Sequence, residues 1–140
     1  MYNNKIITME KLKYRTVIYW MGESMQRLAM SFDPINSQLT MLLSDDVGFH
    51  DDGGNPNEKG YYVGMIEEVL KTGKPLLTGY GNIARLEIYP DYTNVEILSH
   101  EGEFMRVPTH KLLEIVKIWN GECKKYRQDP KNYEPISGEL

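Results

Sequence analysis

The chain lacks several features that would narrow its function at once. Its 140 residues include one cysteine, Cys123, so no internal disulfide can form and a reducing, cytoplasmic compartment is favoured. No apolar run approaches the length needed to cross a membrane, and residues 5–10 lack the apolar core of a secretion signal. No phosphate loop, His-Glu-x-x-His, Gly-x-Ser-x-Gly or paired Cys-x-x-Cys motif occurs. The sequence therefore predicts a cytoplasmic protein and offers no local sign of an enzyme.

Residues that could carry catalysis are few and scattered. His50, His100 and His110 are the three histidines, and nothing in the sequence brings two of them together as a general acid–base pair. Cys123 occupies an apolar helical position with no basic motif beside it, as expected of a buried structural thiol. We therefore expect a non-catalytic protein without a cofactor. The alternative is a small-molecule or metal-binding enzyme domain.

Size and composition predict a folded domain. A hydrophobic content of 41% and an aromatic content of 11% are typical of a globular chain, and 140 residues can bury a sizeable core. We place a single α+β domain at residues 1–126. Residues 127–140 form a polar C-terminal tail, predicted to be loosely packed or docked only through Tyr133 and Ile136.

The clearest fold signal is a hairpin in the second half of the chain. Apolar and polar residues alternate at 85–89 and again at 95–97, which predicts two antiparallel strands with one buried face. Residues 90–94 supply the turn between them. Residues 104–107 predict a further short strand.

An amphipathic helix should follow this hairpin. Thr109 is placed to cap its N-terminus with the side-chain hydroxyl. Apolar residues recur at spacings of three and four along one face: Leu112, Ile115, Val116, Trp119 and Cys123. Gly121 costs this helix about 1 kcal/mol relative to alanine, which favours a kink or fraying there. Such a helix should lie on the one-sided sheet and bury both apolar faces.

The N-terminal half carries a similar pattern. Aromatic and β-branched residues predict a strand at 14–20. Alternating apolar residues at 28–32 and 39–43, on either side of a turn at 33–37, predict a hairpin. A hairpin followed by a helix would then occur twice, either by internal duplication or because unrelated hairpins share turn chemistry.

A second amphipathic helix is expected between Asn55 and Gly73. Its apolar stripe consists of Tyr62, Met65, Ile66, Val69 and Leu70. Asn55 and Pro56 mark its start, with Glu58 three residues after the cap, and Gly73 marks its end. We therefore predict an α+β fold in which an antiparallel sheet, built from two hairpins plus extra strands, carries two amphipathic helices on one face.

Negative charge is concentrated in one segment. The chain has 16 basic and 20 acidic residues, and its net charge of −4 disfavours nucleic acids and anionic membranes as partners. Residues 45–58 contain no lysine or arginine and five acids, which are Asp45, Asp46, Asp51, Asp52 and Glu58. These acids could steer a basic protein partner. They could instead bind a hard cation such as calcium, although the spacing differs from the twelve-residue calcium loop, or form a solvated loop without a role.

Tyrosine is the other abundant residue type suited to binding. The chain has ten tyrosines, and tyrosine is enriched at protein interfaces because it combines a large apolar face with a polar tip. Alternation places Tyr89 on the sheet face opposite Leu86 and Ile88, with Tyr92 close by. The predicted partner-binding residues are Asp45, Asp46, Asp51, Asp52, Glu58, Tyr89 and Tyr92.

As a whole, the chain resembles the immunity proteins of bacterial polymorphic toxin systems, such as those of contact-dependent growth inhibition. The likeness rests on a small acidic α+β domain, the acidic stretch Asp45–Asp52, many tyrosines and no catalytic signature. No shared motif is involved, so no functional residue is carried over. The resemblance implies a stoichiometric inhibitor of a cognate toxin, commonly a basic nuclease, whose nucleic-acid-binding surface would face the acidic loop. A self-associating subunit is a third hypothesis, and the oligomeric state is left open.

Overall fold

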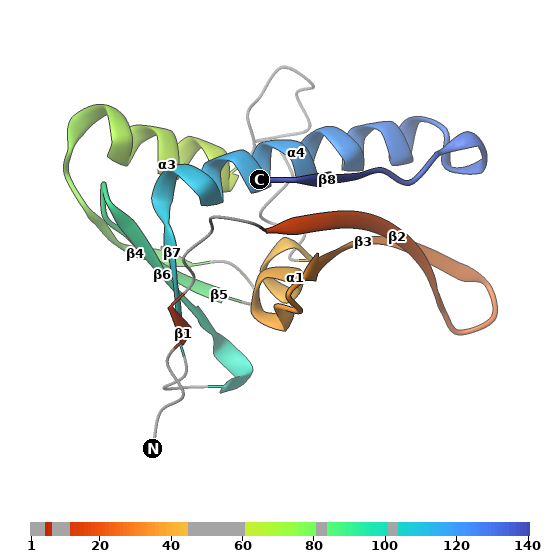
Figure 1. The fold of residues 1–140 in the computed structure, drawn as a ribbon, viewed down its shortest axis with the longest axis horizontal. Coiled ribbons are helices and arrows are strands. Elements are labelled where there is room, and N and C mark those ends of the chain that lie inside the picture. The colour runs from red at the N-terminus through yellow and green to blue at the C-terminus, as the bar shows by residue number, and fades with distance from the viewer. Residues whose placement is uncertain (1–4, 7–11, 45–60, 81–83, 101–103) are drawn as a thin grey trace.

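The strands form two separate sheets within the residues that the computed structural model describes, which are 5–6, 12–44, 61–80, 84–100 and 104–140 (Figure 1). The larger sheet has the strand order β1-β7-β6-β5-β4, and the smaller has the order β3-β2-β8. The strands are β1 (Lys5–Ile6), β2 (Lys13–Met21), β3 (Met25–Asp33), β4 (Leu76–Tyr80), β5 (Ala84–Ile88), β6 (Tyr92–Ile97), β7 (Phe104–Pro108) and β8 (Ser137–Glu139). The helices are α1 (Ser37–Leu43), α3 (Tyr61–Thr72) and α4 (Thr109–Gln128), with short 3-10 turns at Leu98–His100 and Pro130–Asn132. The α+β class is confirmed.

The predicted second hairpin forms the centre of the larger sheet. β5 pairs with β6 and β6 with β7, both antiparallel, so that Leu86, Val95 and Met105 lie side by side across three strands. Every inward residue of these strands is at most 1% exposed: Ala84, Leu86, Ile88, Thr93, Val95, Ile97, Met105 and Val107. β1 adds to β7 in the parallel direction, which departs from the predicted antiparallel pattern.

Helix α4 covers that buried face. It contacts β6 and β7, and its predicted stripe is buried, with Leu112 and Ile115 at 0% exposure. The helix continues through Gly121 to Gln128 without a break, because the packing of its apolar stripe outweighs the roughly 1 kcal/mol propensity cost. In Figure 1, α4 runs along the top of the molecule, above the larger sheet at one end and the β2–β3 hairpin at the other.

The predicted capping role of Thr109 is wrong. Pro108 holds the N-cap position, and no side chain caps the helix. The Thr109 hydroxyl is buried and donates to the Tyr89 carbonyl at 2.6 Å, with the Thr93 hydroxyl 2.9 Å away. Since the single Thr109 proton goes to the carbonyl, the Thr93 hydroxyl donates to Thr109. These bonds fasten the start of α4 to the β5–β6 turn.

The predicted hairpin at residues 28–43 is also wrong. β3 pairs with β2 in register from Lys13↔Asp33 to Met21↔Met25, and residues 37–43 form helix α1. The Asn36 carboxamide oxygen accepts from the Leu39 backbone N–H at 3.0 Å, which is an N-cap. Leu39, Leu42 and Leu43 have helical spacing and are at most 2% exposed. The two hairpins thus lie in different sheets, and the predicted repeat of residues 28–43 in the second hairpin is absent, because residues 37–43 form a helix.

Helix α1 lies between the two sheets, since it contacts both β3 and β6. Helix α3 ends as predicted at Gly73, where φ is +73° and the backbone N–H donates to the Val69 carbonyl at 2.8 Å. Its predicted start at Asn55 and Pro56 lies outside the described residues. In the described residues, no helix is both long and apolar enough to span a membrane.

The C-terminal tail packs more extensively than predicted. β8 pairs antiparallel with β2, from Lys13↔Glu139 to Arg15↔Ser137. Beyond this ladder, Leu12 and Leu140 exchange two backbone hydrogen bonds of 3.3 and 2.8 Å. The expectation of docking only through Tyr133 and Ile136 is therefore corrected: the tail supplies the third strand of the smaller sheet.

Candidate functional site

The predicted acidic cluster is the first candidate. Asp45, Asp46, Asp51, Asp52 and Glu58 all lie outside the described residues, as does His50. Elsewhere, across the part of the chain that the structure does describe, no three His, Cys, Asp or Glu side chains gather closely enough to hold a metal ion. The predicted roles of the acidic cluster therefore stay predictions.

The two predicted tyrosines stack at the β5–β6 turn. The ring centroids of Tyr89 and Tyr92 are 4.8 Å apart, with the ring planes tilted by 35°. The Arg106 guanidinium of β7 lies 4.1 Å from the centroid of the Tyr92 ring, a cation–π contact. Both tyrosines are half-buried. Arg106 therefore holds Tyr92, and through it Tyr89, in one arrangement on the outer face of the larger sheet.

Polar side chains continue this ordered surface across three strands. Arg85 of β5 pairs with Glu96 of β6 at 2.9 Å. The Asn94 side chain donates to the Glu87 carboxylate at 3.4 Å and accepts from the Arg106 Nε at 3.1 Å. Since each charge has an opposite charge or an amide beside it, the face is close to electrically balanced.

A second surface, which the sequence interpretation missed, is the end of the β2–β3 hairpin. Four large side chains there are exposed: Tyr19 at 39%, Trp20 at 61%, Met21 at 46% and Met25 at 51%. We call these four residues the hairpin tip. In Figure 1 the hairpin turn is the point farthest from the larger sheet along the long axis. Isolated apolar residues are common on surfaces, but a cluster of them marks an interaction site.

The sequence carried a signal for this tip. Tyr19, Trp20 and Met21 are three consecutive apolar residues before the turn at Gly22-Glu23-Ser24, and successive residues of a strand cannot all face one core. Gly22 adopts the turn conformation with φ of +73°. The predicted strand at 14–20 and the predicted hairpin at 28–43 do not pair with each other, so that interpretation expects no hairpin turn at Gly22-Glu23-Ser24.

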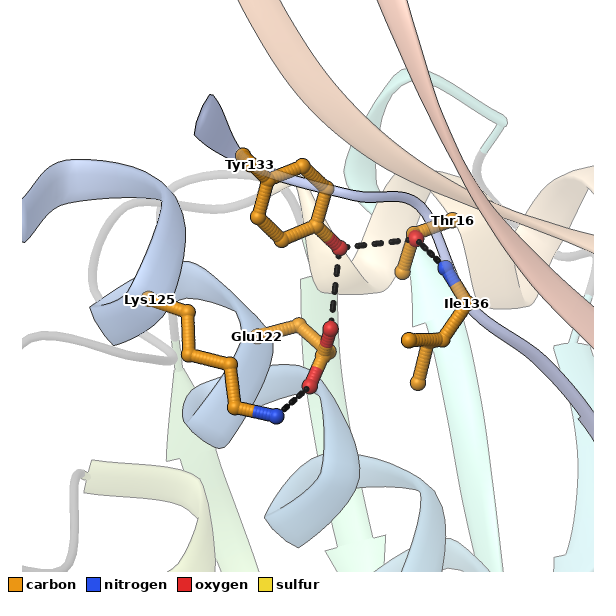
Figure 2. A network of polar contacts seen from close by, with 5 residues as sticks. All are labelled: Thr16, Glu122, Lys125, Tyr133 and Ile136. Atoms are coloured by element: carbon orange, nitrogen blue, oxygen red, sulfur yellow. Dashed lines mark hydrogen bonds and ion pairs between the residues drawn. The ribbon is translucent and has the colours of Figure 1, made fainter. Parts of the chain in front are cut away.

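A buried polar network joins the tail to the rest of the fold (Figure 2). Glu122 of α4 is 4% exposed and accepts from the Tyr133 hydroxyl at 2.9 Å and from Lys125 at 3.0 Å. The Thr16 hydroxyl lies 2.7 Å from the Tyr133 oxygen and accepts from the Ile136 N–H at 2.9 Å. The Tyr133 hydroxyl donates its one proton to Glu122, so it accepts a hydrogen bond from the Thr16 hydroxyl. The hydrogen bonds therefore run in one direction, from the Ile136 N–H through Thr16 and Tyr133 to Glu122.

The Tyr133 hydroxyl and the Cys123 thiol both have raised pKa values, which disfavours their reactive, ionised forms. Burial raises the pKa of the Tyr133 hydroxyl to about 12, with Glu122 adding to the shift. Burial likewise raises the pKa of the Cys123 thiol from 9.0 to about 12, against a smaller opposing effect of Arg127. A thiol that stays protonated is a poor nucleophile, so the geometry favours a structural role for Cys123.

Comparison with protein-family models, with curated proteins and with solved structures found no match in any of the three.

Proposed function

We propose that this chain is a non-catalytic binding protein that holds one protein partner in a stoichiometric complex, in the manner of the toxin immunity proteins it resembles. The observation that carries this proposal is the hairpin tip, where Trp20 is 61% exposed and where Met21 and Met25, which pair across the hairpin, are about half exposed. Tryptophan, tyrosine and arginine are the residue types enriched among the side chains that dominate binding energy. The partner on this proposal is a basic protein, and a nuclease toxin is the case that the resemblance implies.

The exposed area of the tip indicates how it is used. Its four side chains present roughly 400 Å² of surface, taking about 150–250 Å² for a whole aromatic side chain. A standard interface buries roughly 800 Å² on each partner. The tip is therefore an anchor that enters a pocket of the partner, and adjacent surface supplies the remaining contact.

The distribution of acidic residues along the chain supports a basic partner. Without the five acids of residues 45–58, the chain has 16 basic and 15 acidic residues, so its net negative charge resides in that segment. A concentrated negative segment speeds the approach of a basic protein and loses this effect as salt rises. On this proposal the acidic segment steers the partner, and the tip retains it.

The test begins with a partner captured from the source cells, which is then purified and titrated against the chain by calorimetry. We expect a 1:1 complex, and we expect Trp20→Ala to weaken it at least tenfold. Ile35→Ala is the matched control, because Ile35 is an apolar side chain at 89% exposure away from the tip. Tyr92→Ala tests the outer sheet face. A loss of affinity with Tyr92→Ala but not with Trp20→Ala would move the binding surface there and refute the role of the tip.

The inhibitory part of the proposal needs a functional readout. The partner expressed alone should arrest growth, and co-expression of the chain should restore it. Co-expression of Trp20→Ala should fail to restore growth. A partner that is harmless alone would contradict the immunity function while leaving the binding function intact.

The steering role is tested by the rate of association. Changing Asp45, Asp46, Asp51 and Asp52 to lysine should slow association with the basic partner and flatten its salt dependence. Unchanged kinetics would refute the role of the acidic segment.

A further inference from the structure

A narrow cleft of about 190 Å³ separates the β2–β3 hairpin from the C-terminal half of α4. Its floor is apolar, formed by Leu28 of β3 with Trp119 and Cys123 of α4. Trp119 and Cys123 are 3% and 6% exposed, so the cleft reaches the core of the protein. Tyr126 adds an aromatic wall.

Among the described residues that line this cleft, the charged ones are all basic. Arg27 of β3 and Arg127 of α4 are exposed at its rim. A wider hollow of about 780 Å³ at the other end of the smaller sheet differs, because Asp33 and Glu139 accompany its lysine and arginine. The Arg27 side chain has no hydrogen bond or ion pair with any described residue. The cleft therefore presents positive charge in a chain whose net charge is −4.

We infer that this cleft binds a small amphipathic anion, whose flat apolar body packs against Trp119 and whose carboxylate or phosphate is bound by the arginine rim. Size supports this class of ligand, since a dry cavity of about 150 Å³ holds benzene. A site of about 190 Å³ is large enough for one aromatic ring. Arginine suits the anionic end because its guanidinium binds carboxylate and phosphate through paired hydrogen bonds. This inference does not depend on the proposed protein partner.

The chain has two tryptophans, so a single substitution isolates the fluorescence of Trp119 as a probe of the cleft. Trp20→Phe leaves Trp119 as the single tryptophan, in the floor of the cleft. Phenylacetate and phenyl phosphate are titrated while Trp119 fluorescence is followed, with 2-phenylethanol as the neutral analogue and inorganic phosphate as the anion without a ring. Calorimetry on the unmodified chain checks each result.

We expect a saturable response to the two aromatic anions, and at least tenfold weaker binding of 2-phenylethanol and of phosphate. Arg27→Gln and Arg127→Gln should each weaken phenyl phosphate binding at least tenfold. Arg15→Gln is the matched control, since Arg15 is an exposed arginine of the wider hollow. Inorganic phosphate binding as tightly as phenyl phosphate, an equal loss with Arg15→Gln, or no saturation with any probe would each overturn the inference.

Discussion

The larger sheet and the β2–β3 hairpin are both built mainly from antiparallel strands, yet they bury their side chains differently. In β5 and β6, buried and half-buried residues alternate strictly from end to end. In β2, burial is greatest at Thr16 and declines until Tyr19, Trp20 and Met21 are exposed in succession. Helix α4 packs on β6 and β7 of the larger sheet, with α1 on β6 and α3 on β4, whereas the end of the hairpin is exposed. The larger sheet is therefore the scaffold, and the hairpin is surface that the fold leaves open for contact.

The largest expected difference between the two regions is in stability. Leu86→Ala removes a fully buried side chain from β5 and should lower the free energy of unfolding by about 2–5 kcal/mol. Leu28→Ala, at a half-buried position of β3, should cost roughly 1 kcal/mol because part of that side chain already meets water. Urea denaturation followed by circular dichroism measures both. Equal losses would show that the hairpin is as deeply packed as the sheet.

The next loss of stability is expected from breaking the hydrogen bonds that join the C-terminal tail to β2 and α4. Tyr133→Phe removes the hydroxyl between Thr16 and Glu122, so the buried carboxylate keeps Lys125 alone. We expect the free energy of unfolding to fall by about 1–3 kcal/mol. Tyr126→Phe is the control, because its ring lies 5.5 Å from Tyr133 while its hydroxyl has no partner among the described residues. A similar cost for both variants would refute the role of the network.

A further effect, absent at neutral pH, is expected in alkali. Burial raises the folded-state pKa of Cys123 from 9.0 to about 12 and that of Tyr133 from 10.0 to about 12. Folding thus favours the protonated forms, and their contribution is complete below about pH 9 and is lost as pH rises toward 12. Urea midpoints at stepped pH should decline less steeply in Cys123→Ala combined with Tyr133→Phe. Parallel declines would contradict this assignment.

The smallest effect on stability is expected at the hairpin tip. Trp20→Ala removes a side chain that is 61% exposed, so the free energy of unfolding should change by less than about 0.5 kcal/mol. The same variant should lose partner binding. A large loss of stability would mean that Trp20 belongs to the fold rather than to a contact surface.

The C-terminal hairpin and helix could be predicted because their local pattern and their packing agree. The alternation at 85–89 and the stripe from Leu112 to Cys123 each describe one apolar face, and the two faces meet. Residues 39–43 were ambiguous, since Leu39, Met41 and Leu43 alternate as in a strand while Leu39, Leu42 and Leu43 have helical spacing. The Asn36 cap and the contact with two sheets decide for the helix.

The sequence by itself determined the α+β class, the buried faces of β5, β6 and α4, and the end of α3 at Gly73, because each depends on residues close together in the chain. Only the tertiary structure decided which strands pair, that the tail completes the smaller sheet, and that Thr109 binds the Tyr89 carbonyl. It alone also brought Trp119 and Leu28 together in the cleft and left the hairpin tip uncovered. The physical reason is that the burial of a residue depends on the element that packs against it. Local periodicity in the sequence does not identify that element.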